Sequence, residues 1–177
     1  MLVFINNTYG SPFVIEGILP VDAIGNVTVT IGGKNYTMPV DKGNVTFSIP
    51  GLDAGNYTVT VYYSGDNNYN NETRVILATV PPLATMLTVD ITNTSYGVPL
   101  GFNITFTTVN GEPLNQTVIL TLNGVDYPVE LVNGSAIKQF PGLGAGDYTW
   151  SVNYPGTQNY IFTNKAGNLT VYPVKQY

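Results

Sequence analysis

The chain has 177 residues and a formal net charge of −5, and charged residues make up only 10% of it. It contains no histidine and no cysteine. These absences exclude serine–histidine triads, cysteine nucleophiles, zinc sites built from thiolate or imidazole, and disulfides. The acidic balance, with only six Lys plus Arg, argues against nucleic acid as a partner. No stretch approaches the roughly 20 apolar residues of a membrane span, so we expect no direct membrane insertion.

The composition favours β-structure over helices. A hydrophobic content of 44% is sufficient for a buried core, and valine, threonine, isoleucine and tyrosine, which are abundant, fit a pleated and half-buried surface. No window shows the apolar spacing of i, i+3, i+4 and i+7 that marks an amphipathic helix. We therefore expect an all-β protein.

Short segments that alternate apolar and polar residues run through the first half of the chain. Val27–Ile31 and Tyr57–Val61 show the two-residue period of half-buried strands. Gly32-Gly33 and Lys42-Gly43 supply the positive φ angles that tight hairpins require. The pattern predicts seven strands here, near residues 2–6, 12–18, 26–31, 35–41, 44–49, 56–63 and 73–80.

An internal repeat divides the chain. Pro50–Thr58 recurs as Pro141–Thr149 at an offset of 91 residues. Between the copies, Val80–Ala84 contains two adjacent prolines, which are typical of a short and stiff connector. We therefore expect one domain at residues 1–80, a proline-rich linker at 81–85 and a second domain at 86–177.

The second copy repeats the strand pattern with one insertion. Upstream, Tyr9-Gly10 matches Tyr96-Gly97 at an offset of only 87, so this copy carries four extra residues, which we expect in the loop around 109–113. Its strands are predicted near 86–92, 100–108, 116–122, 126–132, 135–140, 147–154 and 167–173. Seven short strands with regular turns in each copy predict two tandem immunoglobulin-like β-sandwiches.

A tyrosine motif sharpens this prediction. Tyr57 and Tyr148 stand where each copy crosses from its fifth to its sixth strand, the place of the tyrosine corner, in which the hydroxyl bonds to upstream backbone. Two residues on, where an antibody domain has a cysteine, stand Val59 and Trp150. We interpret both tyrosines as structural, and we expect apolar packing to replace the disulfide.

Three segments together resemble the bacterial-type Ig-like repeats of archaeal adhesin-like proteins, best known from gut and rumen methanogens. They are Gly25–Thr37, the corner motif Leu52–Tyr57 with its copy Leu143–Tyr148, and Tyr62–Tyr69. The resemblance covers nearly the whole chain and is closer in the first copy. In the second copy Ser64, Asp66 and Asn67 are replaced by Pro155, Thr157 and Gln158. The resemblance implies a sandwich fold and a cell-surface location, but no ligand.

Asn-x-Ser/Thr triplets are frequent and make N-glycosylation a candidate modification. A chain rich in asparagine and threonine also produces many such triplets by chance, so the alternative is that none is used. The candidate acceptors are Asn6, Asn26, Asn35, Asn44, Asn56, Asn71, Asn93, Asn103, Asn115, Asn133 and Asn168.

Two further candidate sites have structural alternatives. Asp66, Asn67 and Asn68 offer oxygen ligands of the kind that Ca²⁺ prefers, although a turn held by local hydrogen bonds explains them better. Tyr154 and Tyr160 are candidate contacts for a ligand, since exposed tyrosine gives a rigid surface with a polar tip. Their recurrence as Tyr63 and Tyr69 favours packing instead. We predict no other metal site.

The eleven acidic residues are scattered and none recurs at matching strand ends, so we expect no catalytic residues, no cofactor and no enzyme activity. Our leading hypothesis is a monomeric, extracellular fragment of an adhesin-like surface protein, whose Ig-like repeats form a stalk for attachment. The alternative is a module that itself recognises a glycan or a protein on a partner cell. The sequence leaves the ligand open.

Overall fold

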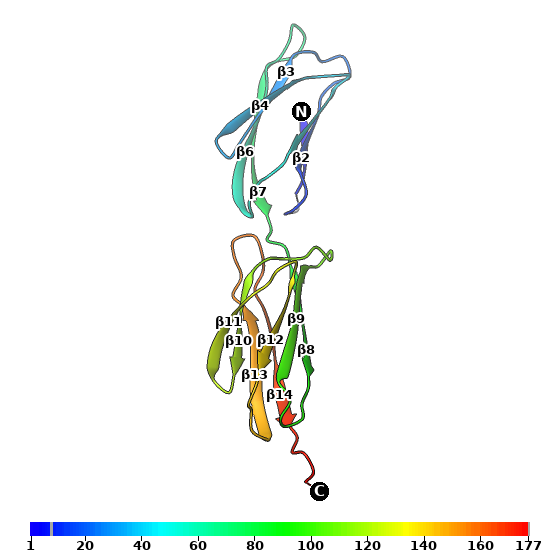
Figure 1. The fold of residues 1–177 in the computed structure, drawn as a ribbon. Helices are drawn as coiled ribbons and strands as arrows, with labels where there is room; N and C mark the ends of the chain where they lie inside the picture. Colours follow the sequence, from blue (N-terminus) through cyan, green and yellow to red (C-terminus); the bar gives the residue numbers. More distant parts are fainter. Residues whose placement is uncertain (8, 177) are drawn as a thin grey trace. The chain divides into compact units, whose positions relative to one another are not determined.

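A computed structural model describes residues 1–7 and 9–176, which form fourteen strands (Figure 1). The chain divides into two compact units, Met1–Pro82 and Leu83–Tyr177. Within the described residues no helix is long and apolar enough to cross a membrane. The regular structure of the described residues consists of strands, so the protein is all-β, as the sequence predicts.

The first unit contains two antiparallel sheets that enclose one core. A three-stranded sheet has the order β1-β2-β5 and a four-stranded sheet the order β4-β3-β6-β7. The chain crosses between the sheets after β2, β4 and β5, which gives the arrangement of an Ig-like sandwich. The strands are β1 (Leu2–Asn6), β2 (Phe13–Ile18), β3 (Asn26–Ile31), β4 (Lys34–Pro39), β5 (Asn44–Ile49), β6 (Gly55–Tyr63) and β7 (Glu72–Val80).

The second unit repeats this topology strand for strand. Its sheets have the orders β12-β9-β8 and β11-β10-β13-β14, so β8, β9 and β12 correspond to β1, β2 and β5. The strands are β8 (Thr85–Thr92), β9 (Leu100–Thr108), β10 (Thr117–Leu122), β11 (Val125–Glu130), β12 (Ser135–Phe140), β13 (Gly146–Tyr154) and β14 (Thr163–Val171).

The fourteen predicted strands all exist, and the prediction of tandem sandwiches is confirmed. The last strand was placed wrongly, because residues 167–173 were predicted and β14 covers Thr163–Val171. The cause is the long hairpin with β13, in which Tyr154 pairs with Thr163 and Gly146 with Val171. The start of β14 carries polar residues at an edge of the sheet, so its sequence shows no alternation.

Each core is built from the inward-facing residues of both sheets. In the first unit Val27 and Val29 of β3 and Val59 of β6 are completely buried, and they pack with Phe13 and Ile15 of β2. In the second unit the corresponding β-branched and aromatic positions form a separate core around Phe102, Val118 and Val152. Each unit therefore has its own hydrophobic core.

The two positions expected to replace a disulfide both lie in these cores. Val59 is completely buried, and Trp150 is half-buried against the core of the second unit. The indole ring packs edge-on against Phe102, with 6.0 Å between the ring centroids. Opposite it on β14 stands Gly167, where an added Cβ would come within 3.1 Å of the indole. A glycine there leaves room for the tryptophan.

Hairpin turns use the residues that their backbone requires. Lys42 and Asn133 have φ angles of 48° and 51°, and the glycines that follow them have 79° and 72°. A Cβ on Gly43 would lie 2.6 Å from the carbonyl oxygen of Leu19, and one on Gly134 2.7 Å from that of Phe106. Both the left-handed backbone and the close approach exclude larger residues.

The same contacts locate the insertion in the second copy. The N–H of Leu19 donates to Gly43 at 2.8 Å and that of Phe106 donates to Gly134 at 2.7 Å, so Leu19 and Phe106 are equivalent. In the first unit the next buried side chain after Leu19 is Ala23, four residues later. In the second unit its equivalent at the offset of 91 is the buried Leu114, eight residues after Phe106. The extra residues therefore lie between Phe106 and Leu114, in the predicted loop.

Candidate functional site

The tyrosines at the sheet crossings are both bonded to backbone. The hydroxyl of Tyr57 donates a hydrogen bond to the carbonyl oxygen of Asp53 at 2.6 Å, and that of Tyr148 donates one to Gly144 at 2.8 Å. In each case the acceptor lies four residues upstream, where the chain passes from the three-stranded to the four-stranded sheet. Both hydroxyls thus hold the backbone of the crossing.

Asp66 organises the loop between β6 and β7. Its Oδ1 accepts hydrogen bonds from the backbone N–H groups of Asn68 at 2.7 Å and Tyr69 at 2.8 Å. Its Oδ2 accepts one from the N–H of Ile24 at 2.8 Å and lies 3.1 Å from the hydroxyl of Tyr63. The N–H of Ile24, followed by those of Asn68 and Tyr69, lowers the pKa of Asp66 below 3.8.

This geometry bears on the calcium candidate at Asp66, Asn67 and Asn68. Both carboxylate oxygens of Asp66 already accept hydrogen bonds from N–H and O–H donors, which a cation would displace. Asn67 and Asn68 are exposed at the tip of the loop. Among the described residues no group of three or more His, Cys, Asp or Glu side chains could hold a metal ion. The arrangement has the features of a hydrogen-bonded turn.

In the corresponding loop of the second unit, a threonine hydroxyl accepts the backbone hydrogen bonds that Oδ1 of Asp66 accepts in the first. Thr157 Oγ1 accepts hydrogen bonds from the backbone N–H groups of Asn159 at 3.3 Å and Tyr160 at 3.2 Å. Tyr154 is 2% exposed and its ring lies 4.6 Å from that of Phe106. Tyr154 is therefore a core residue, and Tyr160 is half-buried against the core. These two tyrosines therefore do not form an exposed platform, because alternate residues of β13 must face the core.

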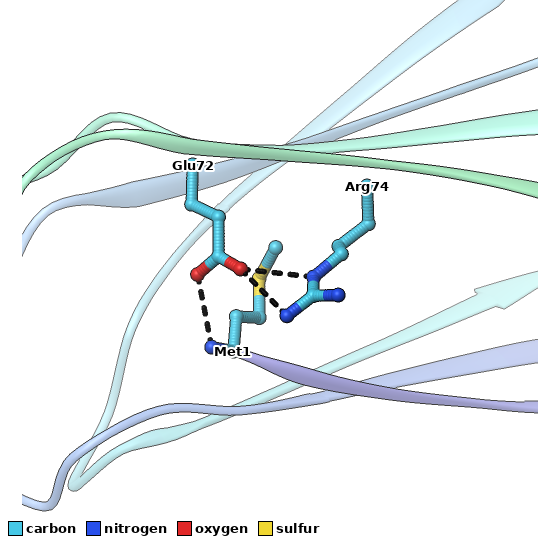
Figure 2. Close-up of polar contacts among 3 residues, drawn as sticks. All are labelled: Met1, Glu72 and Arg74. Atoms are coloured by element: carbon cyan, nitrogen blue, oxygen red, sulfur yellow. Dashed lines mark hydrogen bonds and ion pairs between the residues drawn. The ribbon is translucent and has the colours of Figure 1, made fainter.

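Met1, Glu72 and Arg74 form a small ionic cluster in the first unit (Figure 2). Glu72 Oε2 accepts a hydrogen bond from the amino group of Met1 at 2.9 Å. Its Oε1 lies 2.9 Å from Nε of Arg74 and 2.8 Å from a terminal guanidinium nitrogen. The amino group first, and Arg74 second, lower the pKa of Glu72 below 4.5. Each of the three charged groups thus has an opposite charge within the cluster.

The candidate glycosylation sites lie at the surface. Of the eleven asparagines, ten are exposed, and only Asn103 on β9 is half-buried. The triplet that starts at Asn6 includes residue 8, which lies outside the described residues. Asn56 accepts a hydrogen bond from the hydroxyl of Thr79 at 2.8 Å, whereas the side chain of Asn168 has no such bond within the described chain. Exposure alone thus leaves ten positions accessible to modification.

A groove of about 700 Å³ lies on the second unit, lined by residues at the end of β14, the start of β13 and the end of β8. Ile91 and Leu169 supply apolar wall. The polar wall includes Asn123, Asp147, Thr149, Asn168, Thr170 and Tyr172. Among these polar residues only Asn168 is a candidate from the sequence, as a glycosylation acceptor. The others come from three separate segments of the chain, and nothing in the sequence links these segments.

Hydrogen bonds fix two of these polar side chains. Asp147 Oδ1 accepts from the hydroxyl of Thr170 at 2.7 Å, its cross-strand neighbour. Asn123, in the left-handed turn between β10 and β11 with φ 45°, accepts through Oδ1 from the N–H of Thr149 at 2.8 Å. The second oxygen of Asp147 and the amide nitrogen of Asn123 have no partner in the part of the chain that is described. Both residues line the groove, and each has one polar atom without a partner among the described residues.

Tyr172 is held by its backbone rather than by its side chain. Its N–H donates to the carbonyl oxygen of Thr94 at 2.8 Å, and its own carbonyl accepts from the N–H of Tyr96 at 2.8 Å. This parallel bridge continues the contact between the β14 and β8 segments. The ring is 59% exposed, so an aromatic surface stands at the rim of the groove on a fixed backbone.

Solved structures with related shapes come from several bacterial proteins. The fibronectin(III)-like modules of Clostridium thermocellum CbhA are 10% identical, with 99% of this chain and 98% of that chain covered and a TM-score of 0.43. A 1.5-MDa bacterial ice-binding adhesin is 15% identical, with 98% and 65% covered and a TM-score of 0.38. The Bacteroides ovatus glucan-utilization protein SGBP-B, solved with a mixed-linkage heptasaccharide, is 15% identical, with 94% and 43% covered and a TM-score of 0.28.

A family model matches the first unit. No curated protein matches the chain. Residues 6–80, which include all strands of the first unit except most of β1, match the model of the bacterial Ig-like domain (group 3). The match agrees with the sheet orders β1-β2-β5 and β4-β3-β6-β7 of that unit. The first unit is therefore an Ig-like domain, and its sequence is similar to the bacterial group 3 model.

Proposed function

We propose that the chain is a non-catalytic segment of an adhesin-like surface protein, in which Ig-like repeats form an extracellular stalk for attachment. The observation that carries the proposal is the repetition of a self-contained unit: each copy closes its own core with the same sheet orders. Units of this kind add length without depending on their neighbours for folding.

The connector supports a spacer role. β7 ends at Val80, which is buried in the first unit, and β8 begins at Thr85. Pro81 and Pro82 stand between them, and each proline fixes its own φ and restricts the residue before it. A connector of this composition limits bending between repeats, which is what a stalk needs in order to hold a binding tip away from the cell.

The ionisable groups with shifted pKa values serve the fold in this proposal. Asp66 bonds to backbone donors of its own loop, and Glu72 pairs with Met1 and Arg74. Perturbed carboxyls are otherwise a mark of active sites, but here each has an internal partner that accounts for its shift. The exposed candidate acceptor asparagines suit a secreted chain.

Labelling of intact cells tests the location directly. An antibody raised against the folded chain is expected to stain intact cells of the source organism as strongly as permeabilised ones. An antibody against a ribosomal protein serves as the control and must stain only permeabilised cells. Staining that appears only after permeabilisation would contradict an extracellular stalk.

A further inference from the structure

We propose that the groove on the second unit is a binding site for a neutral oligosaccharide. The inference concerns an activity beyond the stalk role, and either can fail without the other. It rests on three features of the groove: its polar groups, its aromatic rim and the lack of equivalent groups in the matching hollow of the first unit.

The polar groups match sugar hydroxyls. A hydroxyl both donates and accepts hydrogen bonds, so it is best met by acceptors and donors placed side by side. The unpaired oxygen of Asp147 accepts, the unpaired amide nitrogen of Asn123 donates, and the Asn168 amide offers both. Hydrogen bonds to a charged acceptor such as Asp147 are the stronger kind.

These groups are in place before any ligand arrives. Thr170 fixes one oxygen of Asp147, and Thr149 fixes the carbonyl of Asn123. Thr149 also pairs with Asn168 across β13 and β14, which places the asparagine on the same face. Groups held in this way lose little conformational entropy on binding, which raises affinity.

The rim suits the apolar face of a pyranose ring. Tyr172 is exposed on a backbone fixed by two hydrogen bonds, and Ile91 and Leu169 line the wall. An aromatic ring offers a rigid, largely apolar surface to the C–H groups of a sugar. The volume of about 700 Å³ falls in the range of small-ligand sites. Because no Lys or Arg lines the groove, an anionic sugar would face Asp147 without a counter-charge.

The first unit supplies an internal comparison. The equivalent hollow is only about 290 Å³ and is lined by residues that include Asn56, Leu77 and Ala78. At the offset of 91, these stand in place of Asp147, Asn168 and Leu169. The bond from Thr79 to Asn56 copies the bond from Thr170 to Asp147.

Both units therefore have a hollow at this place in the fold, but only the second unit has the polar groups proposed to contact a ligand. Asn123 is matched by Gly32 and Tyr172 by Pro81, so the turn amide and the aromatic rim are also missing from the first unit.

The test is a titration of the ¹⁵N-labelled full chain, produced in a host that adds no N-glycans so that Asn168 stays bare. The probes are cellotetraose, xylotetraose, mannotetraose and chitotetraose, each raised to millimolar concentration. We expect at least one to shift the side-chain amide signals of Asn123 and Asn168 saturably, with the signals of the first unit unchanged. A cationic peptide, tetralysine, is titrated as a control for simple attraction to Asp147. The proposal is overturned if none of the four sugars shifts these signals, if the shifts spread over both units, or if only tetralysine causes shifts.

Variants grafted from the other repeat give matched controls. The double variant Asp147→Asn with Asn168→Leu carries the residues of the first unit and is expected to weaken binding at least about tenfold. The reciprocal variant Asn56→Asp with Leu77→Asn changes the same number of residues in the first unit and should bind as the parent does. Well-dispersed spectra of both variants show that they fold. Undiminished binding by the first variant would overturn the site.

Discussion

The hydroxyl of Tyr63 donates a hydrogen bond that is shared between the carbonyl oxygen of Ile24, at 2.5 Å, and Oδ2 of Asp66, at 3.1 Å. The equivalent hydroxyl of Tyr154 is buried without a partner among the described residues. The two repeats thus bury the same tyrosine, but only the first gives its hydroxyl a partner. One of the two acceptors in the first unit, Asp66, is replaced by Thr157 in the second. This difference leads to the first two predictions.

Replacing each tyrosine by phenylalanine should have opposite effects. Tyr63→Phe removes a made hydrogen bond and leaves Asp66 short of a donor, so we expect a loss of roughly 1–3 kcal/mol. Tyr154→Phe removes an orphaned hydroxyl and should leave the free energy of unfolding unchanged or raise it. Urea unfolding of the second unit can be followed by fluorescence of Trp150, the only tryptophan, and that of the first by circular dichroism. Equal losses in the two units would contradict this account.

Restoring the acceptor should stabilise the second unit. Thr157→Asp places a carboxylate three residues after Tyr154, the spacing of Tyr63 and Asp66. We expect a gain of about 1 kcal/mol in the free energy of unfolding, measured by Trp150 fluorescence in urea. The same substitution in a Tyr154→Phe background is the control. If the gain is equally large there, the hydroxyl is not its source.

The stability of the first unit should depend on pH through Asp66. Its pKa is lowered in the folded state, mainly by the N–H of Ile24, so its contribution is present above the unfolded pKa near 3.8 and is lost as the pH falls through the folded pKa. Asp66→Asn should therefore flatten the loss of stability between about pH 5 and pH 2. The lowered pKa of Glu72 acts in the same window.

For that reason the comparison is made in a Glu72→Gln background. The readout is the denaturation midpoint of the first unit at a series of pH values, with and without Asp66→Asn. An unchanged slope would show that Asp66 has the same pKa in both states.

The crossing tyrosines are predicted to act as structural corners. Tyr57→Phe and Tyr148→Phe each remove a hydroxyl that bonds to backbone four residues upstream, and each should cost its own unit about 1 kcal/mol. Tyr36→Phe is the control, since Tyr36 packs against the core without a hydroxyl hydrogen bond in the described structure. The loss of stability is measured from the midpoints of urea unfolding. Losses no larger than that of Tyr36→Phe would refute the structural role.

Alternation and the repeat predicted the strands well, because one face of each strand must be buried and the side-chain period is two. The exception, β14, starts with Thr163 and continues through polar residues at the sheet edge, where burial imposes no pattern. The repeat itself carried the missing signal, since β7 begins at Glu72 and the offset of 91 points to Thr163.

The groove could not be predicted in the same way. Asn123, Asp147 and Asn168 become neighbours only through the pairing of β13 with β14 and the turn after β10. The type of Tyr154 suits both a core and a binding surface. Its recurrence as Tyr63 favoured packing, and its place on β13 buries it. The sequence feature that could have pointed to the groove is a difference between the repeats at exposed positions, such as Asn168 in place of Leu77.

Small-angle X-ray scattering of the full chain tests the stalk proposal most directly. A single compact domain of this length has a radius of gyration of about 16 Å. If the repeats and their two-proline connector act as a spacer, the measured value is well above that figure, and the distance distribution shows a second maximum from pairs of atoms in different units. A radius near the compact value with a single symmetric maximum would contradict the proposal.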